Sequence, residues 1–143
     1  MVTWAPTLDE VAGCIPTRTV NVNLPGEDEY LNTFNDDTRP TGLQAQQIID
    51  HAVTDAEAIV TSITPALEPL AKNAVMWRAA ADIELAYPDR NADANYYAQL
   101  DARARYEWDQ FRKATESQGS NTETGVPTWT FPEPTWWGDR NDI

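Results

Sequence analysis

The stretch LAKNAVMWRAAADIELAY, residues 70–87, decides the fold of this protein. Its interior is nearly all apolar or small for about five helical turns, which is typical of a helix surrounded by other elements. Three successive alanines at 79–81 allow neighbouring backbones to approach closely. Pro69 is tolerated in a first helical turn, and the Tyr87-Pro88 step ends the pattern. We therefore expect a central helix from about residue 69 to 87, with a small helical bundle around it.

Two helices are predicted before this one, and each opens with a capping box. Thr7 and Glu10 begin a short helix that Pro16 ends. Thr41 and Gln44 begin a longer helix, which we expect to continue to about residue 64, before the next proline. Apolar residues at steps of three and four mark its inward face: Ala45, Ile48, Ile49, Ala52, Ala56, Ile59 and Ile63.

A β-hairpin is predicted between these two helices, at about residues 17–34. Apolar and polar residues alternate from Val20 to Leu24, which is the period of a strand. Pro25-Gly26 favours a turn, and YLNTF at 30–34 can return as the second strand. The tip would be strongly acidic, since it carries Glu27, Asp28 and Glu29.

A fourth helix is predicted from Asn91, its N-cap, to about residue 118. Its core stripe consists of Tyr97, Leu100, Ala104, Trp108, Phe111 and Ala114. The opposite face alternates charges that can pair within the helix: Asp101, Arg105, Asp109 and Lys113. A helix of this length is about 40 Å long, so we expect its far end to project beyond the bundle.

The chain from 119 to 143 is predicted to be an extended, Pro/Trp-rich tail that binds a partner, following a helical domain at 1–118. Its prolines exclude a helix, and no period organises its side chains. The proposed anchors are Trp129, Phe131, Pro134, Trp136 and Trp137. The apolar area they could bury nearly balances the entropy lost on ordering the segment, so firm binding needs a partner or neighbouring subunit. Folding back over its own bundle is the alternative.

Composition and motifs argue against several classes of function. A net charge of −13 disfavours binding to phosphate backbones or anionic lipid. The sequence has no long apolar run, no basic and apolar leader and a single cysteine, so we expect a cytoplasmic protein without a disulfide. His51 and Asp55 share a helix face but have no further ligands, and Trp77 and Trp108 fit core packing. No catalytic residue, metal or cofactor is predicted.

Several segments, in this order, resemble one family: PTLDEVAGCI, NTFNDDTRPTGLQAQQIIDHAVTDA, RAAADIELAYPDR and YYAQLDARARYEWDQF. The chain is similar to head-to-tail adaptor proteins of long-tailed bacteriophages over residues 6 to about 115. The most specific stretch is TFNDDTRPT at 33–41, supported by IELAYP at 83–88. The tail from 119 onward lies outside the resemblance.

The resemblance implies a dodecameric ring below the portal of the phage head, which extends the DNA channel towards the stopper and tail. It implies a structural protein of the virion neck, made and assembled in the host cytoplasm, with no cofactor. The aromatic tail would bind the portal or a neighbouring subunit. The acidic tip at 27–29 would face the lumen or the next ring, and DNA would pass without specific binding. Asp36, Asp37 and Arg39 are candidates for intersubunit contacts, although a local cap explains Arg39 equally well.

Two other classes remain as alternatives. An acidic DNA mimic or inhibitor that binds a basic host protein would fit the net charge, but it would carry carboxylates in rows rather than alternating with bases. A carbohydrate-binding module would use exposed tryptophans, but such platforms normally lie on rigid sheets.

Overall fold

The computed structural model describes residues 2–24, 26, 29–60, 62–87 and 94–123, with side chains in the last helix from 95 to 117. Four α-helices and one short 3₁₀ helix lie in these residues: α1 (Leu8–Cys14), η1 (Pro16–Thr19), α2 (Gly42–Glu57), α3 (Glu68–Ala86) and α4 (Ala94–Glu123). The prediction of a mainly helical protein is therefore confirmed.

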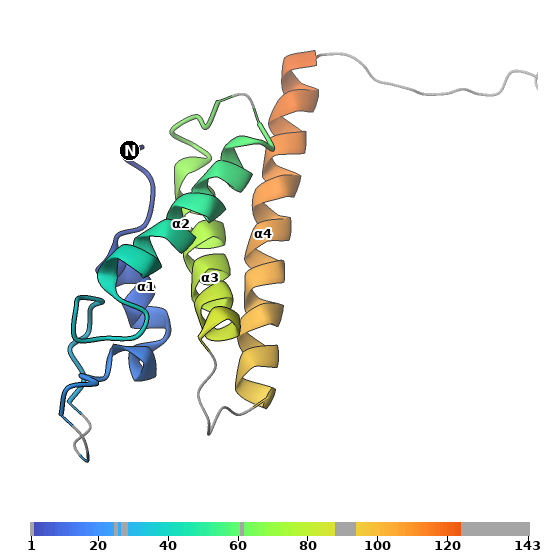
Figure 1. Ribbon diagram of the computed structural model, residues 1–143. Coiled ribbons are helices and arrows are strands. Elements are labelled where there is room, and N and C mark those ends of the chain that lie inside the picture. Colours follow the sequence, from blue (N-terminus) through green and yellow to red (C-terminus); the bar gives the residue numbers. More distant parts are fainter. Residues whose placement is uncertain (1, 25, 27–28, 61, 88–93, 124–143) are drawn as a thin grey trace, which may run out of the picture.

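Helix α3 is the centre of the bundle, as the sequence predicts. It packs against α1, α2 and α4, with its longest interface along α4 (Figure 1). It begins at Glu68 with Pro69 in the first turn and ends at Ala86, next to the predicted break. Its buried side chains are mostly small: Ala71, Ala74, Val75, Ala79, Ala80, Ala81, Ile83 and Glu84. Small side chains let three helices approach one axis closely, and α3 can therefore serve as a shared core.

Both predicted capping boxes are present. The Thr7 hydroxyl accepts from the Glu10 amide at 3.2 Å, and the Glu10 carboxylate accepts from the Thr7 amide at 2.9 Å. Thr41 and Gln44 repeat this arrangement at 3.3 and 3.0 Å. Each box satisfies two amides that a helix start leaves unpaired, and this fixes where α1 and α2 begin.

Helix α2 ends earlier than predicted, at Glu57 rather than near residue 64. The sequence after it, Ile59, Val60 and Thr61, is β-branched, and such side chains lose rotamer freedom in a helix. Ile59 and Ile63 are nevertheless half-buried against the core. The apolar stripe was thus identified correctly, but its last members pack from a connecting segment instead of a helix.

The predicted β-hairpin at 17–34 is wrong in its secondary structure. The described residues contain no strand, and only the pair Val20 and Tyr30 forms an isolated antiparallel bridge. Pro16–Thr19 forms a 3₁₀ turn, and the Val22 amide donates to the Asp37 carbonyl at 2.8 Å instead of across a hairpin. Val22 and Tyr30 both remain exposed, so the apolar alternation covers no core that would hold two strands together. The turn is present at Gly26, with φ of 85°.

Helix α4 continues to Glu123, so residues 119–123 are helical and not part of an extended tail as predicted. Its 30 residues correspond to about 45 Å. Leu100, Ala104 and Phe111 are buried, which confirms the centre of the predicted stripe. Figure 1 shows α4 continuing past the neighbouring ends of α2 and α3, as expected. None of the described helices combines the length and the apolar character that crossing a membrane requires.

Candidate functional site

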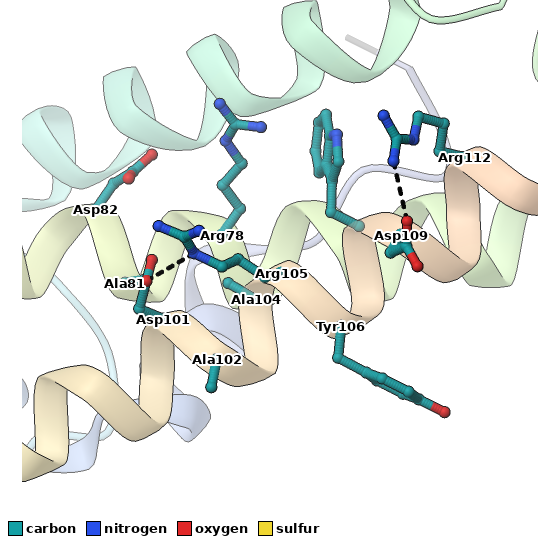
Figure 2. Close-up of a pocket in the computed structure, with 11 residues that line it drawn as sticks. Arg78, Ala81, Asp82, Asp101, Ala102, Ala104, Arg105, Tyr106, Asp109 and Arg112 are labelled. Carbon is teal, nitrogen blue, oxygen red and sulfur yellow. Dashed lines mark hydrogen bonds and ion pairs between the residues drawn. The ribbon is translucent and has the colours of Figure 1, made fainter.

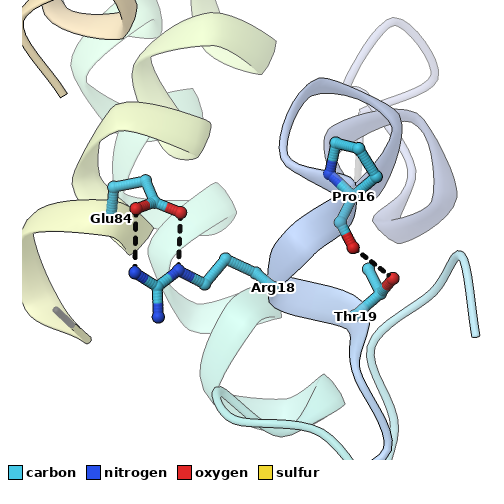
Figure 3. Close-up of polar contacts among 4 residues, drawn as sticks. All are labelled: Pro16, Arg18, Thr19 and Glu84. Atoms are coloured by element: carbon cyan, nitrogen blue, oxygen red, sulfur yellow. Dashed lines mark hydrogen bonds and ion pairs between the residues drawn. The ribbon is translucent and has the colours of Figure 1, made fainter. Parts of the chain in front are cut away.

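A buried ion pair joins η1 to α3 (Figure 3). The Arg18 guanidinium donates twice to the Glu84 carboxylate, at 2.5 and 2.9 Å, and only 12% and 6% of the two side chains are exposed. The Thr19 hydroxyl donates to the Pro16 carbonyl at 2.6 Å and supports the turn that presents Arg18. Burial, with the nearby Glu84 carboxylate adding to it, raises the pKa of Tyr96. This pair is enclosed and bidentate, which suits a structural joint more than a binding site.

An open groove of about 830 Å³ lies between α3 and α4 (Figure 2). Charged side chains from both helices line it: Arg78, Asp82, Asp101, Arg105, Asp109 and Arg112. Trp108 and three alanines supply its apolar surface, while the Tyr106 ring points away from Arg78 and Asp82. The groove is therefore a candidate binding surface.

Arg78 lies between Asp82 and Arg112 along this groove and contacts two other helices (Figure 2). The guanidinium lies 4.3 Å from the centre of the Trp108 ring on α4, a cation–π distance. It also pairs with Asp55 of α2 at 3.3 Å. Arg78 and Asp82 lie one turn apart on α3, but the arginine contacts α2 and α4 instead. One side chain therefore ties three helices together.

The carboxylates of the groove differ in how they are paired. Asp101 accepts from Arg105 at 2.8 Å, and Asp109 accepts from Arg112 at 3.0 Å. Among the described residues, no hydrogen bond or ion pair joins Asp82 to another side chain. Partial burial raises the pKa of Asp82, while the Arg78 charge opposes this shift. Asp82 is exposed at the groove, and in the described part of the chain its carboxylate has no ion pair.

The charge ladder predicted on α4 is confirmed. Pairs at helical spacing join Asp101 to Arg105 and Asp109 to Lys113, the latter at 3.1 Å. The hydrogen bond from Lys113 is the main cause that lowers the pKa of Asp109. The basic groups are exposed and the two aspartates partly so, and the ladder therefore shapes the surface potential of α4 more than its stability.

Most of the partner-binding residues predicted from sequence lie outside the described residues. These are Glu27 and Asp28 of the acidic tip, and Trp129, Phe131, Pro134, Trp136 and Trp137 of the tail. Glu29 is described and is exposed. Its carboxylate accepts from the Asn21 side chain at 3.0 Å, so it is anchored to the loop that precedes it.

The intersubunit candidates 36, 37 and 39 lie in a turn that leads into α2. The Asp37 carboxylate accepts from the Asn23 side chain at 2.5 Å, whereas Asp36 is exposed. Arg39 donates to the Thr38 and Asp36 carbonyls of its own turn, at 2.7 and 3.3 Å. This is the local contact that the sequence left open for Arg39, and an intersubunit role stays a prediction.

Neither the single cysteine, Cys14, nor His51 has surroundings that favour chemistry. Burial raises the pKa of Cys14 to about 11, so its thiol is protonated at neutral pH and is a poor nucleophile. His51 is exposed on α2. No group of three or more potential metal ligands occurs within the residues that the structure describes.

Comparison with family models, with curated proteins and with solved structures finds no match to this chain. The groove and its surroundings must therefore be interpreted from their own geometry.

Sequence reasoning missed the Arg18–Glu84 pair and the contacts of Arg78, because both join elements far apart in the chain. One signal was available: Glu84 follows Ile83 and lies one turn after buried Ala80, on the apolar side of α3. A carboxylate in such a position requires a partner, and Arg18 is among the few cations before it in the chain.

Proposed function

We propose that this protein is a structural subunit of a bacteriophage neck, a head-to-tail adaptor that forms a ring under the portal. The ring, a dodecamer by resemblance, would extend the DNA channel towards the stopper. The observation that carries the proposal is the shape of the bundle. A closed core supports one long helix, α4, which continues past its neighbours and leads into the aromatic segment 124–143.

The most specific segment of the resemblance, TFNDDTRPT, is a turn held by its own hydrogen bonds. This gives a structural reason for the residue types in it. The Asn35 amide donates to the Thr38 hydroxyl at 3.0 Å, and that hydroxyl lies 2.7 Å from the Pro40 carbonyl. The Asp37 amide donates to the Asn35 side chain at 2.7 Å. A Cβ on Gly42 would lie 2.8 Å from the Phe34 carbonyl oxygen, so this position needs glycine.

The charge of the chain suits a channel for DNA. With a net charge of −13, a ring of such subunits would repel the phosphate backbone and let it slide without sticking. We propose that the acidic loop around Glu29 faces the lumen or the next ring. The protein would take no part in a chemical reaction and would act through its contacts alone.

The pairing on α4 favours this role over that of a DNA mimic. A mimic presents rows of free carboxylates, whereas Asp101 and Asp109 are both neutralised by basic neighbours on the same helix. The acidic excess of the described residues therefore does not form a phosphate-like row along this surface.

Light scattering of the protein alone and with the matching portal ring tests the proposal. We expect the full chain to add to the portal as a ring. Replacing Trp129, Phe131, Trp136 and Trp137 by alanine should abolish this, because the aromatic anchors would be gone. The matched control replaces Thr128, Thr130 and Thr135 by alanine and should bind normally. A full chain that ignores the portal would refute the adaptor, and an aromatic variant that still binds would refute only the role of the tail.

A further inference from the structure

The groove between α3 and α4 is lined by one carboxylate, Asp82, for which no ion pair is found within the described residues. Its other charged side chains all have one: Arg78 pairs with Asp55, Asp101 with Arg105, and Asp109 with Arg112. Asp82 is the exception within the described residues. Its side chain is exposed at the groove wall, and the Arg78 charge acts on it without a direct contact. A cation that entered the groove could contact Asp82 without displacing an existing ion pair.

The apolar part of the groove suits flat, aromatic groups. The Arg78 guanidinium covers the Trp108 ring at 4.3 Å, and Arg105 and Arg112 lie along the same groove. Aromatic rings of an occupant can stack on the guanidinium planes of the groove. Proline-rich, extended segments bind in grooves that contain aromatic side chains such as Trp108. A volume of about 830 Å³ is within the usual range of binding pockets. We therefore expect the occupant to be an extended peptide with aromatic side chains and one basic side chain that contacts Asp82.

The chain carries one segment of this description outside the described residues. Residues 124–143 contain three tryptophans, one phenylalanine and three prolines, and Arg140 is their only basic residue. The segment follows the end of α4 directly. Asp101 lies 22 residues before Glu123, or about 33 Å along the helix axis. An extended chain from 124 to 140 spans about 50 Å, so Arg140 can reach the level of Asp82 and Asp101.

We infer that residues 127–140 of the same chain bind along the α3/α4 groove of the free protein, with Arg140 on the Asp82 carboxylate and tryptophans against the arginine-lined wall. A short covalent linker gives the segment an effective concentration of about 1 mM at its own groove, which favours this site over that of a second molecule in dilute solution. The inference stands independently of the adaptor function. Within an assembly, the same segment would leave the groove for a partner.

Limited proteolysis of the full-length protein with chymotrypsin tests the inference, because a bound segment resists cleavage after Trp136 and Trp137. We expect Asp82→Lys and Arg140→Glu each to speed this cleavage about threefold to tenfold. The double variant, which reverses the pair, should return to within about twofold of the natural chain. Asp50→Lys, the same charge change on exposed α2, is the matched control and should change nothing. Arg140 is not part of the described helices, so its variant tests the contact even if Asp82→Lys lowers stability.

Three outcomes would overturn the inference. Cleavage in the natural chain as fast as in an isolated peptide of residues 124–143 would show that the segment is not bound. Protection that rises with protein concentration would identify a second copy as the occupant. Protection that neither charge variant changes would place the segment on another surface. None of these measurements involves the portal, so a failure here is distinct from a failure of the adaptor function.

Discussion

Glu84 and Asp82 are two residues apart on α3, yet their environments are opposite. Glu84 is 7% exposed and receives two hydrogen bonds from one guanidinium. Asp82 faces an open groove and, in the described part of the chain, has no such contact. Two positions along a helix differ by about 200° in direction, so one helix can present a carboxylate to the interior and another to a groove.

The comparison separates a buried charge from an exposed one. The Arg18–Glu84 pair has lost its water but satisfies both partners, so it fixes where η1 docks on α3. Asp82 is exposed, yet nearby protein atoms raise its pKa and no ion pair in the described part of the chain compensates for this. Such a carboxylate lowers stability slightly and can contact a cation that enters the groove. We therefore assign a structural role to the Arg18–Glu84 pair and propose Asp82 as an interaction site.

The largest effect is expected from breaking the buried pair. Arg18→Met leaves the Glu84 carboxylate enclosed without its partner, and the free energy of unfolding should fall by about 3–5 kcal/mol. Urea denaturation measures this. The double variant Arg18→Met with Glu84→Leu should recover most of the loss, because neither charge then remains buried. A single variant that loses less than about 1 kcal/mol would contradict the view of this pair as a joint.

A smaller effect is expected from Arg78→Ala, since its contacts are partly exposed. It removes the cation–π contact with Trp108 and the pair with Asp55, and we expect a loss of about 1 kcal/mol. Arg103→Ala is a matched control, because Arg103 lies 4.7 Å from the centre of the Trp77 ring and pairs with Glu107. Similar losses would show that both arginines stabilise the bundle through tryptophan. If the free energy of unfolding fell as far as expected for Arg18→Met, Arg78 would have a structural role like that of the buried Arg18–Glu84 pair.

The opposite sign is expected at Asp82. Asp82→Asn removes a carboxylate whose pKa is raised mainly by burial, so it should stabilise the protein at neutral pH, by at most about 1 kcal/mol because the side chain is solvated. In the natural protein, Asp82 binds its proton more tightly in the folded state than in the unfolded state. The stability of the natural protein relative to the Asp82→Asn variant therefore improves as pH falls through the raised pKa. The advantage of the variant should vanish near the ordinary value of 3.8. Thermal unfolding between pH 3.5 and 7 measures the difference, and a constant gain would contradict this cause.

The smallest effect is expected at the exposed pair of Glu10 and Lys72, 2.6 Å apart, which joins α1 to α3. The hydrogen bond from Lys72 lowers the pKa of Glu10, so its contribution is present above the ordinary value of 4.5 and is lost as pH falls through the lowered pKa. Lys72→Met should cost at most about 0.5 kcal/mol at neutral pH and nothing in acid. Chemical denaturation in low salt at both pH values tests this. A cost that persists in acid would show that the lysine acts through packing of its aliphatic chain.

Local rules predicted the parts of the fold that local contacts determine. The Thr7 and Thr41 capping boxes, the central helix and the charge ladder of α4 each depend on residues within four positions of one another. The segment 17–34 could not be predicted in this way. Its described backbone pairs across the loop only around Val20 and Tyr30, the Val22 amide donates to Asp37, and the side chains do not close a sheet face. The groove was also beyond sequence reasoning. Arg78 could have paired with Asp82 along its own helix, and only the approach of α2 and α4 decides otherwise.

Five of the buried positions in α3 are alanines: Ala71, Ala74, Ala79, Ala80 and Ala81. A larger residue at such a place pushes helices apart, and a glycine weakens the helix itself. Descent with modification has little freedom here, whereas the exposed charges of α4 can be exchanged at small cost. Related proteins would thus first lose sequence similarity on the surface. The spacing of the small residues along α3 would be retained longest.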